Sequence, residues 1–162
     1  MAIMTPGEVL DRLSDFPLSS FAPGEAVLSP ATATGRLLFL REGVVDVALE
    51  HVFIARVTEP GAVFGDVSFL LDQPHSAAVV AAEASRFHVV EDPEAFLETE
   101  PRIAIYVARI LARRLNAVNH LLAEARHRID APDGPPAHLR ETLDRMGHAL
   151  QIHFPTDTQR SA

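Results

Sequence analysis

The sequence contains no cysteine among its 162 residues. This absence excludes disulfides, thiolate zinc sites and cysteine nucleophiles together. Basic residues are also few, since 14 Lys and Arg stand against 22 Asp and Glu and give a formal net charge of -8. Nonspecific binding to nucleic acid or to an anionic membrane relies on a basic surface, which this balance does not provide. Any anionic ligand must therefore be held by a local site.

Long hydrophobic runs are missing as well. No window is long enough to span a bilayer, and the first eight residues lack the basic start and apolar run of a secretory signal. We therefore expect a cytoplasmic protein without membrane association. The length suits one domain with some appended helix, and 48% hydrophobic with 22% charged residues is typical of a globular protein.

Short apolar runs dominate residues 21–91, and Gly, Pro or charged residues separate them. The runs cover residues 26–28, 37–40, 44–49, 52–57, 62–64, 78–82 and 87–90. Their length, valine content and spacing predict the strands of an antiparallel sandwich or roll. Glu50 and His51 are expected to form a tight hairpin. Gly24, Gly43 and Gly61 each fall where a run ends and are expected in turns that need a positive φ.

Helices are expected on both sides of the strand region. Thr5, Pro6 and Glu8 form an N-terminal capping pattern for a short helix that reaches about Ser14, with an apolar edge continued to Leu18. Asp92 is expected to cap a second short helix. A much longer helix follows, because residues 103–126 contain no Gly or Pro.

The long helix carries apolar residues at alternating spacings of four and three. These residues are Ala104, Ala108, Leu111, Leu115, Val118, Leu122 and Ala125. Such a heptad seam suits another helix, so we predict a homodimer through helix 103–126. A second stripe contains Ile103, Val107, Ile110, Ala117 and Leu121 and can cover the strands. The alternative is that both stripes pack within one monomer.

The expected domain organisation has two parts. Residues 1–126 form the main domain, including the long helix, and residues 127–162 hold a linker, a short amphipathic helix and a flexible tail. The apolar residues of that helix are Leu139, Leu143, Met146 and Leu150. A helix-turn-helix domain needs several helices with a core of their own, so we expect no direct DNA binding.

Residues 64–77 are the candidate binding segment. Gly65 opens one short turn of helix, and a turn at Pro74 returns His75 and Ser76 toward the start of that helix. A helix N-terminus presents unpaired N–H groups, and a glycine there lets a phosphate approach the backbone closely. The segment therefore predicts a site for a small anion.

Four segments then carry a family resemblance: Phe21-x-x-Gly24-Glu25, residues 38–45, residues 60–66 and residues 74–77. In this order they resemble the cyclic-nucleotide-binding domain of bacterial catabolite-activator-type regulators, kinase regulatory subunits and gated channels. The resemblance covers roughly residues 16–126. It implies an α+β fold, in which helices flank an antiparallel, jelly-roll-like β-roll and a long C-terminal helix serves dimerisation.

The resemblance also implies a ligand, cyclic AMP or cyclic GMP, and makes residues 64–77 a phosphate-binding cassette. In the family, an acidic residue bonds the ribose 2′-hydroxyl, an arginine pairs with the cyclic phosphate, and a hydroxyl residue and cassette N–H groups complete the site. The corresponding cassette positions here are Gly65, Asp66, Val67, Ser68, His75, Ser76 and Ala77. The base would meet the long helix near Val118 and Asn119.

Two positions depart from the family's pattern. Asp66 replaces a glutamate and is one methylene shorter, so reaching the same hydroxyl requires a shifted ligand or a bridging water. His75 replaces the arginine, and imidazole is only partly charged near neutrality. A charge-assisted hydrogen bond contributes about 1.5 to 3 kcal/mol, so its loss lowers affinity by roughly ten- to a hundredfold.

These residues allow two functions and argue against a third. The first is a stand-alone cyclic-nucleotide sensor that signals weak binding to an unidentified protein partner. The second is a degenerate domain that has lost the ligand and serves dimerisation or protein interaction. The third, a cupin-type enzyme, needs closely spaced histidines, whereas His51, His88 and His120 stand alone. We therefore predict no catalytic residues and no metal.

Overall fold

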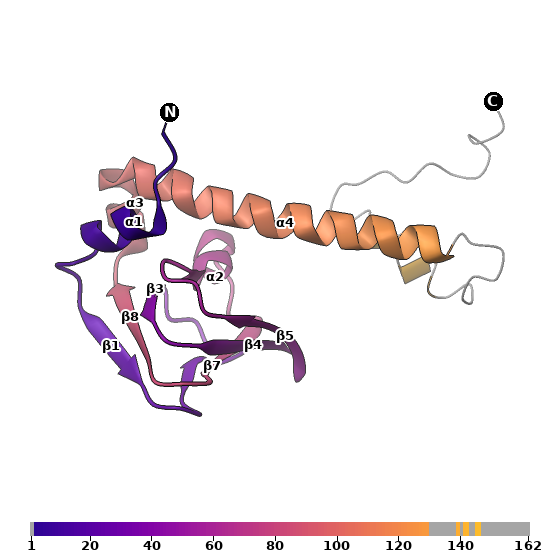
Figure 1. Ribbon diagram of the computed structural model, residues 1–162, viewed down its shortest axis with the longest axis horizontal. Helices are drawn as coiled ribbons and strands as arrows, with labels where there is room; N and C mark the ends of the chain where they lie inside the picture. Colours follow the sequence, from indigo (N-terminus) through magenta and orange to yellow (C-terminus); the bar gives the residue numbers. More distant parts are fainter. Residues whose placement is uncertain (1, 130–138, 140, 143–144, 147–162) are drawn as a thin grey trace. The chain divides into compact units, whose positions relative to one another are not determined.

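The computed structural model describes residues 2–129 and, beyond them, residues 139, 141–142 and 145–146. Within residues 2–129, helix α1 precedes strands β1 to β6, helix α2 follows, and strands β7 and β8 lead to helices α3 and α4 (Figure 1). The predicted linker 130–136 lies outside the described residues. Most positions of the expected C-terminal helix and tail lie outside them too.

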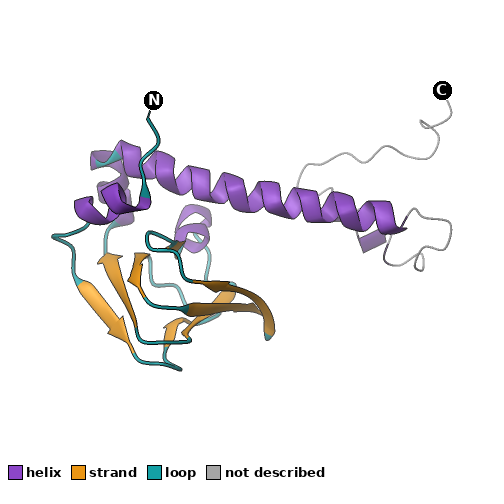
Figure 2. Cartoon of the chain, in the orientation of Figure 1, coloured by secondary structure: helices purple, strands orange, loops and turns teal. Residues whose placement is uncertain are grey.

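The strands of residues 2–129 form two antiparallel sheets of four strands (Figure 2). The first sheet has the order β1 (Leu18–Phe21), β8 (Ser85–Val90), β3 (Leu37–Glu42) and β6 (Val63–Phe64). The second has the order β2 (Ala26–Leu28), β7 (Ala77–Ala81), β4 (Val45–Leu49) and β5 (Val52–Val57). This arrangement confirms the predicted antiparallel β-roll, and β2 to β8 match the predicted runs within two residues at each end.

Strand β1 is the element that the sequence pattern did not predict. Its four residues include Ser19 and Ser20, and its side chains alternate between exposed and half-buried, so no apolar run marks it. Leu18 was expected to continue the apolar edge of the first helix, and this was wrong. The helix ends before Pro17, and Leu18 pairs with His88 on β8. The strand forms because it can pair with β8, which is a long-range contact.

The core lies between the two sheets, because one cluster of buried side chains draws on both. Phe87 and Leu40 of the first sheet are fully buried, and Val45 and Val79 of the second sheet belong to the same cluster. The ring of Phe87 meets Phe21 and Phe64 edge to face, with centroid distances of 5.6 and 5.8 Å. Edge-to-face contacts stabilise aromatic pairs beyond the burial of their area. Strands that lie far apart in the sequence are thereby held together.

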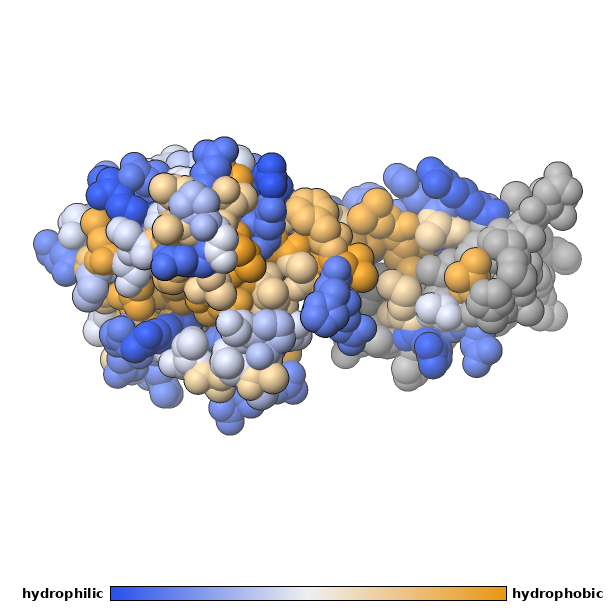
Figure 3. All heavy atoms as spheres, turned by 90° about the horizontal axis from the view of Figure 1, so that it is seen from below, coloured by the Kyte–Doolittle hydropathy of each residue, from blue (hydrophilic) through white to orange (hydrophobic). Residues whose placement is uncertain are grey.

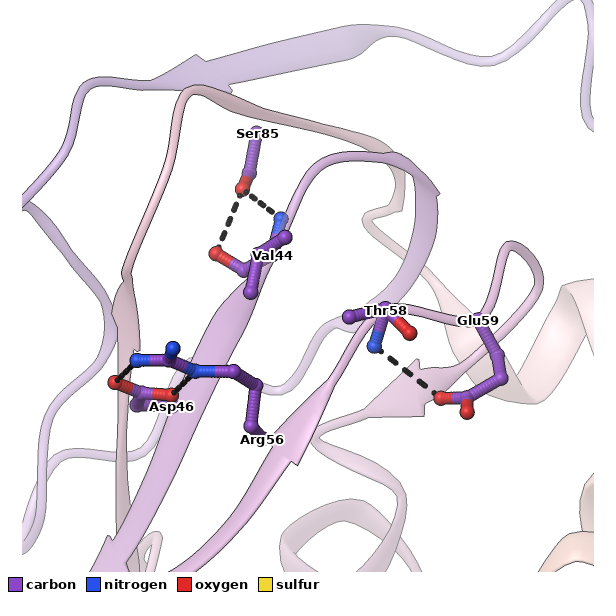
Figure 4. Close-up of polar contacts among 6 residues, drawn as sticks. All are labelled: Val44, Asp46, Arg56, Thr58, Glu59 and Ser85. Atoms are coloured by element: carbon purple, nitrogen blue, oxygen red, sulfur yellow. Dashed lines mark hydrogen bonds and ion pairs between the residues drawn. The ribbon is translucent and has the colours of Figure 1, made fainter.

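The hairpin between β4 and β5 turns at the predicted residues. Glu50 and His51 have φ values of 47° and 67°. Positive φ at both central residues is the conformation of the type I′ turn that commonly closes a two-residue hairpin. Arg56 of β5 donates two hydrogen bonds to the Asp46 carboxylate of β4, at 2.7 and 2.8 Å (Figure 4). The Arg56 guanidinium lowers the pKa of Asp46 through these bonds. The pair fixes the register of this hairpin on its exposed side.

Gly43 and Ser85 join the start of β4 to the start of β8. The Ser85 hydroxyl lies 3.1 Å from the Val44 amide nitrogen and 3.2 Å from the Val44 carbonyl oxygen (Figure 4). A Cβ on Gly43, whose φ is 112°, would lie 2.5 Å from the Ser85 Cα atom. The glycine is therefore required by both its backbone conformation and this close approach.

Short helices begin where the capping patterns predicted. In α1 (Pro6–Arg12) the Thr5 hydroxyl accepts from the Glu8 amide, and the Glu8 carboxylate accepts from the Thr5 amide at 2.6 Å, which forms a capping box. In α3 (Pro93–Thr99) Asp92 accepts from the amide of the third helical residue. Both helix starts are therefore encoded by local side-chain bonds.

The long helix α4 (Pro101–Ile129) begins against the β-roll. Ile103 and Val107 are buried, and the Tyr106 hydroxyl donates to the Gly61 carbonyl at 3.0 Å. Contacts divide the chain into two compact units at this helix, residues 1–110 and residues 111–162. The first turns of α4 therefore belong to the β-roll unit.

The second unit contains the rest of α4. Hydrophobic side chains lie exposed along this part of the helix (Figure 3). Leu115, Val118 and Leu121 are each more than 40% exposed. Among the described residues, no helix combines the length and the apolar character that crossing a membrane requires.

Candidate functional site

The candidate site lies where the chain crosses from one sheet to the other. Residues 65–76 join β6 of the first sheet to β7 of the second, and residues 29–36 join β2 of the second sheet to β3 of the first. Because β2 pairs with β7 and β3 pairs with β6, both antiparallel, the two connections lie at the same end of the roll. The fold thus brings two segments together that are far apart in the sequence.

Gly65 is the N-cap of helix α2 (Asp66–Leu71) and has a φ of 82°. Because it has no side chain, no side-chain oxygen caps the first N–H groups of the helix. A Cβ at this position would overlap the Arg36 carbonyl oxygen, which belongs to the neighbouring connection. Gly65 is therefore required both by its left-handed backbone and by the close approach of the Arg36 carbonyl oxygen.

The first residues of α2 have different environments. Asp66 is buried, with 4% of its surface exposed, whereas Val67 is 45% exposed. The Ser68 hydroxyl donates to the Gln73 carbonyl at 2.5 Å, and the Gln73 amide donates to the Ser68 carbonyl at 3.0 Å. Ser68 therefore braces the return of the chain after the helix. The buried Asp66 carboxylate lies at the positive end of the short helix.

His75 is buried, with 6% of its surface exposed, and the neighbouring connection holds it. Its amide donates to the Thr32 carbonyl at 2.8 Å, and its carbonyl accepts from the Ala31 amide at 2.9 Å. Its ring nitrogen Nε2 lies 3.0 Å from the Thr34 hydroxyl oxygen. Both the backbone and the imidazole are thereby fixed by residues 31–34.

The His75 imidazole faces Gly65. Its Cε1 atom lies 3.9 Å from the position that a Cβ on Gly65 would take. Burial lowers the pKa of His75 below its ordinary value of about 6.5, because desolvation disfavours the charged ring. The imidazole is therefore mainly neutral near pH 7, and it charges only in more acidic solution. Ser76 beside it is exposed, and Ala77 begins β7.

The structure therefore brings together part of the predicted site. Gly65, Asp66 and His75 meet at one end of the roll. Val118 and Asn119 belong to the second unit, in which Val118 is 41% exposed and the Asn119 Oδ1 atom is shielded from solvent without a hydrogen-bond partner. A contact between the base and these two residues stays a prediction.

Thr34 is the residue at this site that the sequence did not indicate. It lies 41 positions before His75, in a connection without a recognisable motif. Only the pairing of β2 with β7 and of β3 with β6 brings it to the cassette. A sequence signal would have required knowledge of that pairing.

His51, His88 and His120, which stand alone in the sequence, differ in their environments. His51 and His120 are exposed, and His88 is buried, with Nδ1 3.4 Å from the Phe16 carbonyl oxygen and Nε2 3.4 Å from the Arg41 guanidinium. Within the part of the chain that the structure describes, no three His, Asp or Glu side chains are grouped so that they could hold a metal ion.

Comparisons with known proteins converge on one kind of domain. Residues 18–99 match the family model described as cyclic nucleotide-binding domain. No curated protein sequence matches the chain.

Solved structures with the same fold include regulators from bacteria. The catabolite activator protein of Thermus thermophilus is 27% identical, with a TM-score of 0.62 over 91% of this chain and 84% of that one. A protein from a cyclic-GMP-dependent signalling pathway that regulates bacterial phytopathogenesis is 22% identical, with a TM-score of 0.59 over 72% of this chain and 98% of that one. The structure of PKAR CBD2 bound to Sp-2Cl-cAMPS is 20% identical, with a TM-score of 0.57 over 75% of this chain and 79% of that one.

Proposed function

The chain belongs to the cyclic nucleotide-binding domain family, and on that premise we propose that it is a regulatory module that binds a cyclic nucleotide weakly through residues 64–77. Domains of this family are regulatory and not catalytic, which fits the prediction that the chain is not an enzyme. The ligand proposed is cyclic AMP or cyclic GMP, held without a metal ion.

The observation that carries the proposal is the position of His75 against Gly65. An anion bound at the amide groups that begin α2 would lie near the imidazole, whose Cε1 atom lies 3.9 Å from the position that a Cβ on Gly65 would take. The buried Asp66 carboxylate at the start of α2 is the group proposed to bond the ribose 2′-hydroxyl. Ser76 and the amide groups of residues 66–68 and 77 are proposed to complete the site.

Transmission of binding is proposed to use helix α4. The base would contact Val118 and Asn119, and this contact would favour one arrangement of the helix over another. Exposed apolar residues of the seam, such as Leu115, support a homodimer through helix 103–126. A protein partner would then respond to the helix arrangement.

A second candidate function rests on the lowered pKa of His75. An imidazole that is neutral near pH 7 gives a bound phosphate no full counter-charge, and burial keeps it neutral. This favours a domain that retains the fold but binds no nucleotide, and that serves dimerisation or protein interaction instead.

Isothermal titration calorimetry separates the two functions. Cyclic AMP and cyclic GMP are titrated to millimolar concentration into the wild type and into His75→Arg. The sensor function predicts weak binding by the wild type and roughly ten- to a hundredfold tighter binding by the variant, because a charge-assisted bond contributes about 1.5 to 3 kcal/mol.

The matched control is His51→Arg, which adds the same side chain on the exposed turn between β4 and β5. Its affinity should equal that of the wild type. If neither the wild type nor His75→Arg binds either nucleotide, the sensor function is wrong and the interaction module is supported.

A further inference from the structure

The connection between β2 and β3 packs against the cassette through several of its residues. The backbone of Ala31 and Thr32 bonds the backbone of His75, and the Arg36 carbonyl oxygen lies against Gly65. These contacts place the Thr34 hydroxyl 3.0 Å from the Nε2 atom of the imidazole. The hydroxyl is therefore held at the ring by backbone bonds on the cassette side.

We propose that Thr34 is a positioning residue, whose hydroxyl donates to Nε2 of His75 and so keeps the second ring nitrogen, Nδ1, protonated toward the ligand. The inference rests on the proposed function, because the ligand in question is the phosphate of the cyclic nucleotide. It assigns a role in binding to a residue outside the cassette.

The chemistry of a neutral imidazole leads to this assignment. A neutral ring has one N–H donor and one acceptor nitrogen, and the hydrogen bond at one nitrogen decides which nitrogen carries the proton. Among the described residues, Thr34 is the one side chain that bonds the His75 ring. A Thr34 hydroxyl that donates to Nε2 therefore leaves Nδ1–H as the only ring donor, and an anion needs a donor.

The position of the ring is consistent with this role. The Cε1 atom, which lies between the two nitrogens, is the ring atom nearest to the position that a Cβ on Gly65 would take, at 3.9 Å, so this edge of the ring faces the start of α2. Nε2 is occupied by Thr34, so Nδ1 is the nitrogen on this edge of the ring that remains for a ligand. With the other tautomer, the ring would present a lone pair to the phosphate and repel it.

The role of Thr34 depends on the ring being neutral. Burial is the cause of the lowered pKa of His75, and the charged side chains on the packed elements are Arg36, Asp66 and Asp72. Arg36 is paired with Glu91 at 2.6 Å, while Asp66 and Asp72 lie at the two ends of α2. Once the ring is protonated, both nitrogens donate and Thr34 becomes an acceptor. The tautomer then no longer matters.

The test combines ¹⁵N NMR of the histidine rings with nucleotide titration, on the full chain and the variants Thr34→Val and Thr34→Ser. Near pH 7.5, the wild type and Thr34→Ser should show His75 as the Nδ1–H tautomer, and Thr34→Val should lose this preference. At this pH Thr34→Val should bind cyclic AMP roughly tenfold more weakly than the wild type, because the His75 ring no longer reliably donates a hydrogen bond from Nδ1 to the phosphate. Near pH 5 the affinities of the wild type and of Thr34→Val for cyclic AMP should agree within about twofold.

The outcomes separate this inference from the proposed function. If the wild type binds no nucleotide at either pH, the proposed function fails, while the ring spectrum still decides the role of Thr34. An Nε2–H tautomer in the wild type, or a spectrum that Thr34→Val leaves unchanged, overturns the inference even if the nucleotide binds. Equal weakening at both pH values by Thr34→Val would show a general disturbance of the connection and also overturn it.

Discussion

Gly65→Ala tests the close approach of the Arg36 carbonyl oxygen to Gly65 in the cassette. Gly65 has a φ of 82°, and Gly24, in the turn before β2, has a φ of 88°. A Cβ on Gly24 would meet no atom within 4 Å, whereas a Cβ on Gly65 would overlap the Arg36 carbonyl oxygen. The two alanine variants therefore share the same backbone strain and differ in the overlap.

The expected magnitudes follow from these two contributions. An alanine in the left-handed conformation destabilises the fold by about 1–2 kcal/mol. Replacing glycine by alanine also lowers the conformational entropy of the unfolded chain, which offsets about 0.4–1 kcal/mol of this loss. Gly24→Ala should therefore lower the free energy of unfolding by about 1 kcal/mol. The overlap of an added Cβ with packed atoms costs about 1–3 kcal/mol more. Gly65→Ala should therefore lower the free energy of unfolding by about 2–4 kcal/mol.

Urea denaturation, followed by circular dichroism, measures both variants against the wild type. Gly65→Ala should unfold at a clearly lower urea concentration than Gly24→Ala, and it should also lose nucleotide binding, which Gly24→Ala should keep. Ordinary surface substitutions change the free energy of unfolding by up to about 0.5 kcal/mol. If the free energies of unfolding of the two variants differ by no more than this, the Arg36 carbonyl oxygen does not approach Gly65 closely and the reasoning is refuted.

Further predictions concern acid stability, the ribose contact and the seam. Burial lowers the pKa of His88, so its stabilising neutral form is lost as the pH falls below about 6.5, and urea denaturation should show less acid sensitivity in His88→Gln than in the wild type. An equal pH dependence in the variant would contradict this. Asp66→Ala should weaken cyclic AMP binding up to about tenfold in calorimetry and leave 2′-deoxy cyclic AMP binding nearly unchanged. Equal losses for both ligands would exclude a 2′-hydroxyl contact. The predicted homodimer should dissociate in Leu115→Asp, as measured by sedimentation velocity, and should persist in Arg113→Ala, which lies on another face of the helix. A wild type that sediments as a monomer would contradict dimerisation through the seam.

The β-roll was predictable because local patterns encode its elements. Short apolar runs separated by Gly, Pro or charged residues marked β2 to β8, and the Thr5 and Asp92 caps marked where two helices begin. Strand β1 was missed because Ser19 and Ser20 interrupt its apolar character. Its pairing with β8 supplies the stability that its own sequence does not, and no local pattern shows such pairing.

The site was predictable only in part. The order of Gly65, Asp66 and His75 identified the cassette, since these residues lie close together in the sequence. The role of the environment was not predictable: burial lowers the pKa of His75, and Thr34 reaches its ring through the pairing of four strands. Both properties depend on the tertiary structure, so a sequence pattern could not show them.

Calorimetric titration of cyclic AMP and cyclic GMP into the wild type, in two buffers of different ionisation enthalpy near pH 6.5, tests the central claim most directly. A phosphate held beside His75 raises the pKa of the imidazole, so the free ring takes up protons on binding. The account predicts weak, saturable binding with net proton uptake, and an affinity that rises as the pH falls toward 5. Absence of binding heat at millimolar nucleotide, or binding without proton uptake, would contradict it.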